Sequence, residues 1–180
     1  MAVLTSLCMM SALMPAAAFA TDGDSGVGRT TAGKIRIGDV EWDYNSGPHY
    51  AKTDENNEVR EVSSGDDWSI MWNGTNLTLK DANIVHTDGC AIDAEGDLYI
   101  ILEGGNTVSA SATGNVYQGC ENGLAAIHST GKINIYDGPG PLPDSSLPTI
   151  GSINASVVNT VGDHADGIRA ADDINLNKLL

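Results

Sequence analysis

Apolar and polar residues alternate in short segments along the chain, and three of these segments align without a gap. The aligned segments are residues 91–100 (AIDAEGDLYI), 126–135 (AIHSTGKINI) and 167–176 (GIRAADDINL). An isoleucine recurs at the second position, and apolar residues recur at the eighth and tenth positions. A period of two is typical of β-strands, and the Gly or Asp-Asp between the apolar positions is typical of a corner. Each segment therefore predicts a strand, a corner and a second strand.

The repeat also predicts how these strands are arranged. A partial copy, Leu77-Thr78-Leu79, precedes Leu98 by 21 residues, whereas the later copies are separated by longer, turn-rich insertions. A unit of this size cannot bury its apolar edge alone and stacks on the next copy. A parallel β-helix is therefore expected. A β-sandwich is the competing fold, but it does not require corresponding residues to recur in register.

The two ends of the chain differ from the repeat. Residues 1–20 are uncharged and end in Ala18-Phe19-Ala20, which predicts a cleaved signal peptide; this segment is too short and too polar for a stable membrane span. The expected order is a signal peptide, a flexible lead-in (21–33), an N-terminal β cap (34–72) and β-helix coils (73–180). Because the last coil ends without a polar cap, we expect a chain truncated at its C-terminus, or one that stacks on further coils or on a partner chain.

All three tryptophans lie in the predicted cap. In WSIMW, the alternation places Trp68, Ile70 and Trp72 on one face. This face is expected to close the apolar end of the first coil.

The net charge of −15 limits the classes of partner. Such a surface repels nucleic acid and anionic lipid, and it disfavours acidic polymers unless a divalent cation bridges the two. Once the signal peptide is removed, Cys90 and Cys120 are the remaining cysteines. One disulfide in an oxidising compartment and two separate thiols are both consistent with this pair.

The residues also resemble a known family. The segments WNGTNLTLKDANI, CAIDAEGDLYIILEGGNTV, LAAIHSTGKINIYDGPG and ADGIRAADDINL are similar to the bacterial secreted family of carbohydrate-binding domain-containing proteins. The resemblance covers residues 68–177. It implies a right-handed, single-stranded parallel β-helix related to polysaccharide lyases, with calcium sites and affinity for plant cell-wall polysaccharides.

Stacked copies would align outward residues into columns about 4.8 Å apart. One column contains Asp93, His128 and Arg169, which could bind an acidic sugar or perform proton abstraction, or could simply be complementary charges on neighbouring strands. Exposed tyrosines with hydrogen-bonding neighbours are the usual contacts for sugar rings. Tyr99, Tyr136 and Asn134 are therefore candidate ligand-binding residues, although strand propensity alone also favours tyrosine.

Calcium is the candidate cofactor. Asp88, Asp163 and Asp166 occur in the linkers HTDGC and GDHADG, where carboxylates and backbone carbonyls could converge on a hard cation. Asp-Gly pairs also form ordinary turns, so both interpretations stay open.

The sequence thus predicts a secreted or cell-surface, non-enzymatic β-helix that binds polysaccharide, with calcium as the candidate cofactor. A polysaccharide lyase or related carbohydrate-active enzyme is the first alternative. A structural stalk or adhesin repeat is the second.

Overall fold

The fold consists entirely of β-structure in the part of the chain that the computed structural model describes. The described residues are 33–112, 123–138, 151–159 and 165–178. They form fifteen strands, and they include no helix long and apolar enough to cross a membrane. The predicted signal peptide and all but the last residue of the predicted lead-in lie outside the described residues.

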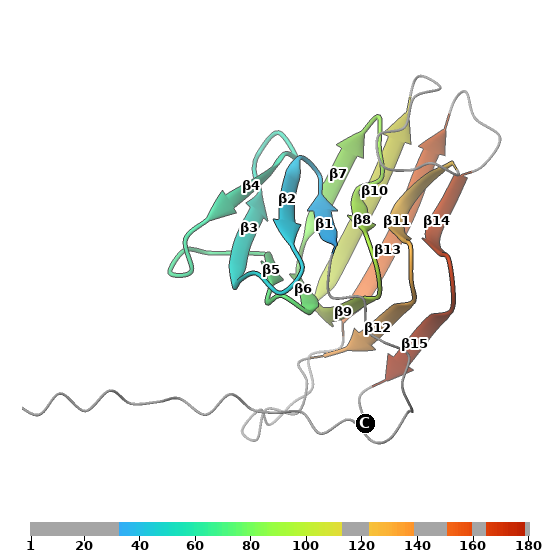
Figure 1. Ribbon diagram of the computed structural model, residues 1–180. Helices are drawn as coiled ribbons and strands as arrows, with labels where there is room; N and C mark the ends of the chain where they lie inside the picture. The colour runs from blue at the N-terminus through green and yellow to red at the C-terminus, as the bar shows by residue number, and fades with distance from the viewer. Residues whose placement is uncertain (1–32, 113–122, 139–150, 160–164, 179–180) are drawn as a thin grey trace, which may run out of the picture.

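The strands form sheets of five, three and seven strands (Figure 1). The five-stranded sheet has, in spatial order, β14 (Ala165–Ala170), β11 (Leu124–Ser129), β8 (Ile92–Ala94), β1 (Lys34–Ile37) and β2 (Val40–Asp43). The three-stranded sheet has β13 (Ser152–Asn159), β10 (Gly105–Ala112) and β7 (Asn83–Thr87). The seven-stranded sheet has β15 (Ile174–Lys178), β12 (Ile133–Asp137), β9 (Leu98–Glu103), β6 (Asn76–Lys80), β5 (Ile70–Trp72), β3 (His49–Thr53) and β4 (Val59–Val62).

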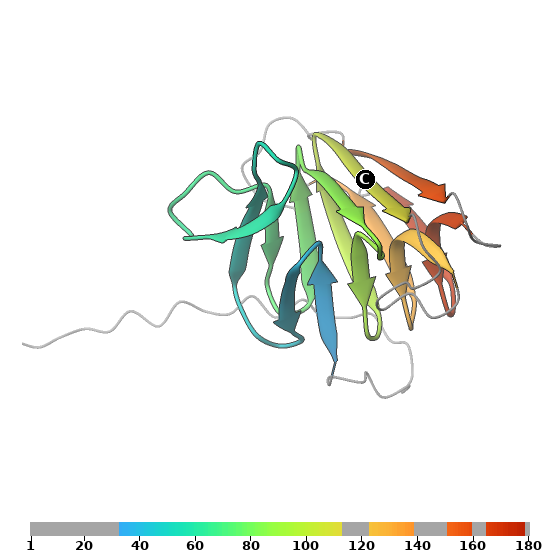
Figure 2. The same ribbon diagram turned by 90° about the horizontal axis from the view of Figure 1, so that it is seen from above.

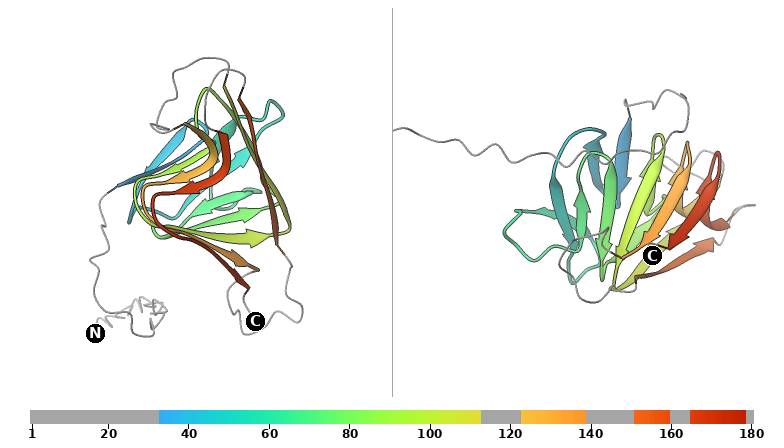
Figure 3. Two further views of the ribbon diagram at one scale, coloured as in Figure 1. Left: turned by 90° about the vertical axis from the view of Figure 1, so that its right-hand side faces the viewer. Right: turned by 90° about the horizontal axis from the view of Figure 1, so that it is seen from below.

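From β6 onward the chain enters the three sheets in rotation. Strands β6, β9, β12 and β15 belong to the seven-stranded sheet, β7, β10 and β13 to the three-stranded sheet, and β8, β11 and β14 to the five-stranded sheet. Neighbours within each of these sets are parallel. The left view of Figure 3 shows the strands nested around a common interior.

The prediction of a right-handed, single-stranded parallel β-helix is wrong. The described strands form three separate sheets, and two of these mix parallel with antiparallel pairs. Sharp corners separate the sheets, with positive φ angles at Asp81 (46°), Asp88 (64°), Gly96 (124°) and Gly104 (66°). The sequence repeat identifies which residues stack on one another. The antiparallel strands lie outside the repeat, and the repeat does not show how the corners divide the chain among three sheets.

The antiparallel strands lie at one end of the molecule (Figure 2). Strand β1 joins the five-stranded sheet by pairing with β8, and β5 joins the seven-stranded sheet by pairing with β6. Their interior is aromatic: the Tyr44 and Trp72 rings meet edge to face with centroids 5.0 Å apart, and Trp42 stacks on His49 at 5.3 Å. The residues predicted to form an N-terminal cap, 34–72, therefore form β1 to β5.

The predicted interior columns are confirmed by the strand register. Ile127 pairs with Ile92 on one side and Ile168 on the other. Ile133 likewise pairs with Leu98 and Ile174. The first two copies bury these positions, whereas in the third copy Ile168 is half-buried and Ile174 is 44% exposed. These two residues lie on β14 and β15, each of which is an end strand of its sheet.

Asn106 holds the corners between the seven-stranded and three-stranded sheets together. This nearly buried side chain accepts a hydrogen bond from the Ala82 N–H (2.9 Å) and donates to the carbonyls of Glu103, Gly104 and Ser152. One amide thereby satisfies backbone groups from three successive copies, which would otherwise be costly to bury.

Candidate functional site

The predicted ligand-binding residues lie on two different sheets. The five-stranded sheet carries Asp93, His128 and Arg169, and the seven-stranded sheet carries Tyr99, Asn134 and Tyr136. These sheets form different walls around the core, so their outer faces point in different directions (Figures 1 and 3). The structure therefore separates the six residues into two groups.

The group on the five-stranded sheet belongs to a longer row of charged residues. The register pairs Arg36 with Asp93, Asp93 with His128, and His128 with Arg169. We call these four residues the charged row. Sequence reasoning missed Arg36 because β1 lies outside the repeat and pairs with β8 in the antiparallel direction.

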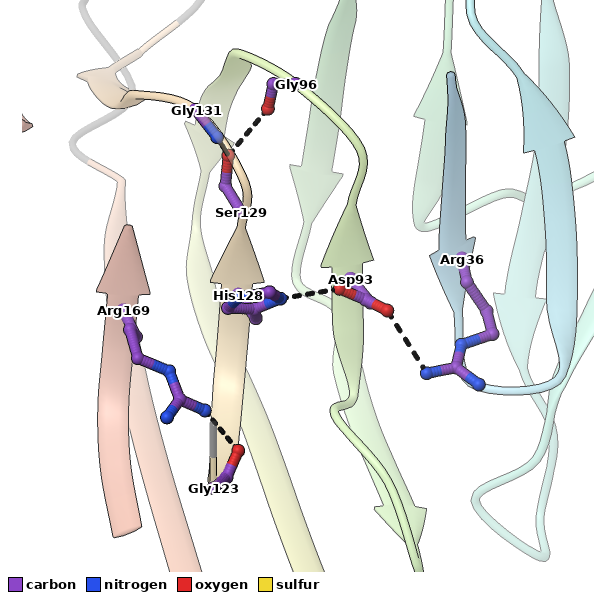
Figure 4. A network of polar contacts seen from close by, with 8 residues as sticks. All are labelled: Arg36, Asp93, Gly96, Gly123, His128, Ser129, Gly131 and Arg169. Carbon is purple, nitrogen blue, oxygen red and sulfur yellow. Dashed lines mark hydrogen bonds and ion pairs between the residues drawn. The ribbon is translucent and has the colours of Figure 1, made fainter. Parts of the chain in front are cut away.

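Three side chains of the charged row, those of Arg36, Asp93 and His128, bind one another (Figure 4). His128 Nδ1 donates to Asp93 Oδ1 over 2.7 Å, and Arg36 Nη2 lies 3.4 Å from Asp93 Oδ2. The Asp93, His128 and Arg36 side chains are only 15%, 12% and 19% exposed. Both oxygens of Asp93 are thus engaged within the protein, which suits a clamp between strands better than a ligand site.

Arg169, at the end of the charged row, also contacts its own chain. Its Nη2 donates to the carbonyl of Gly123, and its Nη1 lies 3.7 Å from Asp166. Next to the row, Ser129 closes a corner: its hydroxyl donates to the Gly96 carbonyl and accepts from the Gly131 N–H (Figure 4). The guanidinium therefore contacts groups of its own chain, and its role as a carboxylate clamp stays a prediction.

The outer face of the seven-stranded sheet has a different character. Residues 98, 100 and 102 of β9 are buried, so the alternate residues of this strand point outward. Directly paired residues share a face, which defines two rows. The polar row contains Asn76, Tyr99, Asn134 and Asn175. The apolar row contains Val62, Tyr50, Met71, Thr78, Ile101, Tyr136 and Asn177; Thr78, on the central strand of the sheet, is only 5% exposed.

The two rows combine aromatic rings with amides. Tyr50, Tyr99 and Tyr136 are half-buried, which leaves part of each side chain accessible. Asn175 donates to Asn134 over 3.1 Å within the polar row. Because neighbouring strands lie about 4.8 Å apart, seven strands extend over roughly 30 Å. Such a face could contact several consecutive units of a polymer.

A groove lies beside Tyr50. Its volume is about 410 Å³, and it is lined by Lys52, Thr53, Asp54, Asn57, Asp67, Trp68, Ser69, Lys80, Asp81 and Asn83. The Trp68 ring lies 5.7 Å from the Tyr50 ring, and Lys80 Nζ lies 5.5 Å from the Trp68 ring centroid. We call it the Trp68 groove; Tyr50 joins it to the apolar row.

The placement of Trp68 corrects one prediction. Ile70 and Trp72 are fully buried as expected, but Trp68 is half-buried and lines the groove. The alternation of inward and outward residues applies only within β5, which begins at Ile70. Trp68 precedes the strand, so period-two counting does not determine its direction.

Among the described residues, the aspartates predicted to bind calcium do not form a cluster. Asp88 and Asp166 are exposed, and the described residues contain no group of three or more His, Cys, Asp or Glu that could hold a metal ion. Asp88 occupies a turn with a φ of 64°, and its N–H donates to the Ser111 carbonyl. Asp163 lies outside the described residues, and the calcium site stays a prediction.

Cys90 is buried and disulfide-bonded. Its predicted partner, Cys120, lies outside the described residues.

Comparisons of the chain with models of known families, with curated proteins and with solved structures found no match. The resemblance to carbohydrate-binding domain-containing proteins therefore stays a prediction.

Proposed function

We propose that this chain is a secreted, non-catalytic protein that binds polysaccharide along the outer face of its seven-stranded sheet. The observation that carries the proposal is the apolar row, because it crosses all seven strands and holds Tyr50 and Tyr136. Sugar rings pack against aromatic faces, and their hydroxyls bond to neighbouring amides and hydroxyls. The polar row supplies amides at Asn76, Asn134 and Asn175 beside these rings.

The length of this face supports a polymer rather than a small ligand. Small-molecule sites are usually enclosed cavities with a few convergent polar groups. The outer rows are instead extended, and the polar row places an asparagine or a tyrosine on each of four neighbouring strands. A linear chain of sugars matches such a surface, since successive hydroxyl groups could meet successive polar side chains.

A glycan array followed by titration of the best ligand tests the proposal. Tyr136→Ala should weaken binding about tenfold, because an aromatic contact contributes about 0.5–1.5 kcal/mol beyond its area and about 1.4 kcal/mol corresponds to tenfold in affinity. Tyr136→Phe, the matched control, keeps the ring and should retain most of the affinity. Unchanged binding by Tyr136→Ala would contradict the proposed face. Release of unsaturated uronides from the ligand would contradict the non-catalytic assignment.

A further inference from the structure

The Trp68 groove brings two lysines to one place on the protein. Lys52 lies on β3 and Lys80 on β6, and Ser69 lies between these strands. The Ser69 N–H donates to the Ala51 carbonyl, and the Lys80 N–H donates to the Ser69 carbonyl over 2.8 Å. Both lysines are exposed and line the groove. The two ammonium groups are thus carried by backbone that is held firmly in register.

These two lysines differ from the other basic residues of the chain. Every other lysine or arginine whose side chain is described forms an ion pair; they are Lys34, Arg36, Arg60, Lys132 and Arg169. In the same part of the chain, neither Lys52 nor Lys80 has a carboxylate within 4.0 Å. A chain with a net charge of −15 has an excess of carboxylates to pair with lysines. In the described part of the chain, the groove therefore holds two ammonium groups without a close ion-pair partner, although the carboxylates of Asp54, Asp67 and Asp81 also line it.

Two of the acidic residues in the groove are already engaged. The Asp54 carboxylate accepts hydrogen bonds from Arg60 and from the N–H groups of Asn56 and Glu58. The hydrogen bond from Arg60 is the main reason that the pKa of Asp54 lies below its usual value. Asp81 accepts the N–H of Gly105 over 2.9 Å. The N–H of Gly105 does not neutralise the Asp81 carboxylate, so Asp81 and the exposed Asp67 would meet a ligand together with the two lysines.

We propose that the Trp68 groove selects an acidic saccharide, with the sugar ring against Trp68 and the anionic group between Lys52 and Lys80. The inference rests on the proposed function, because it assigns a ligand class to one end of the same face. Lys80 Nζ lies 5.5 Å from the centroid of the Trp68 ring, so one ligand could contact both the aromatic ring and the ammonium group. Thr53, Asn57 and Asn83 line the same groove and supply partners for sugar hydroxyls.

Calorimetric titration with a hexamer of galacturonic acid and with its fully methyl-esterified form tests the proposal. The acid should bind at least tenfold more tightly than the ester, because only the acid carries carboxylates for the lysines. Lys52→Gln and Lys80→Gln should each reduce this preference several-fold, and the double variant should abolish it. The matched control is Lys132→Gln, which removes an equal charge from an exposed lysine paired with Asp173; it should keep the full preference.

A sulfated hexasaccharide distinguishes the two sources of negative charge. If it binds as tightly as the uronate, the groove recognises anionic sugars of either kind; if it binds like the ester, the groove recognises carboxylates. Equal affinity for acid and ester, or a full preference in the double variant, would overturn the inference.

The two proposals fail in distinguishable ways. Loss of acid preference in the lysine variants, together with unchanged affinity in Tyr136→Ala, would keep the acidic subsite and reject the extended face. The reverse result would keep the face and reject the acidic subsite. Binding of neither hexamer nor any arrayed glycan would reject both. Circular dichroism of each variant verifies that it is folded.

Discussion

The outer faces of the five-stranded and seven-stranded sheets are built from the same repeat but use their polar groups differently. On the five-stranded sheet, Arg36 and His128 both bind Asp93, so these polar groups pair with one another within the protein. On the seven-stranded sheet, the rows carry aromatic rings and amides, and the adjacent groove holds two lysines with no carboxylate within 4.0 Å in the described part of the chain. The comparison suggests that the first face holds strands together and the second meets a ligand.

The structural role of the charged row follows from the strands it joins. Arg36 belongs to β1, which lies outside the repeat, whereas Asp93 and His128 belong to the repeated strands β8 and β11. The pairing of β1 with β8 involves only three residue pairs. A charged contact at the middle pair therefore adds stabilisation where the backbone ladder is short.

The largest expected effect in this comparison comes from Asp93→Asn. The substitution leaves Arg36 and His128, both largely buried, without their carboxylate, and should lower the free energy of unfolding by about 2 kcal/mol. Urea denaturation measures the loss. Asp173→Asn, at a side chain that is 72% exposed, is the control; it should cost less than about 0.5 kcal/mol. Weaker polysaccharide binding by Asp93→Asn at unchanged stability would reverse the roles of the two faces.

The stacking register could be predicted from the sequence, but the full fold could not. Ile92, Ile127 and Ile168 recur at one position of a gapless repeat, and they pair as expected because parallel stacking places equivalent residues side by side. The antiparallel pairing of β1 with β8 joins residues far apart in the chain and leaves no repeat to find. The division into three sheets depends on corner geometry, which apolar periodicity does not encode.

The candidate site was predictable to a similar extent. Outward alternation identified Tyr99, Asn134 and Tyr136, because period-two counting holds inside regular strands. It could not identify Tyr50, which lies on an antiparallel strand without a counterpart in the repeat, or Trp68, which precedes β5. Complementary charges in the Asp93 column were visible in the sequence. Whether they bind each other or a ligand depends on side-chain contacts that only the structure supplies.

A smaller effect is expected from Arg169→Ala. Removing the guanidinium deletes its hydrogen bond to the Gly123 carbonyl and its contact with Asp166, and should cost about 1 kcal/mol of unfolding free energy. Polysaccharide affinity should not change, since the residue lies on the other sheet. Arg169→Lys keeps the positive charge but lacks the planar guanidinium, so its unfolding free energy should lie between those of Arg169→Ala and the parent protein. Loss of affinity with an unchanged melting temperature would instead make the charged row a ligand site.

The smallest expected effect concerns His86 on the third sheet. Burial lowers its pKa below the usual value; Asp39 and Asp88 raise the pKa, and Arg36 lowers it. A histidine with a lowered pKa takes up its proton more readily in the unfolded chain. As the pH falls below about 6.5, the ordinary histidine value, protonation therefore favours unfolding until the folded-state pKa is passed. The stability that neutral His86 contributes is fully present above about pH 6.5, and it is lost as the pH falls from there to the folded-state pKa.

His86→Gln should accordingly make the decline in unfolding free energy between pH 7 and pH 5 shallower than in the parent protein. Val85→Thr, at the neighbouring exposed position, adds no titrating group and is the matched control; it should keep the parent slope. An unchanged slope in His86→Gln would contradict the lowered pKa of His86 in the folded protein.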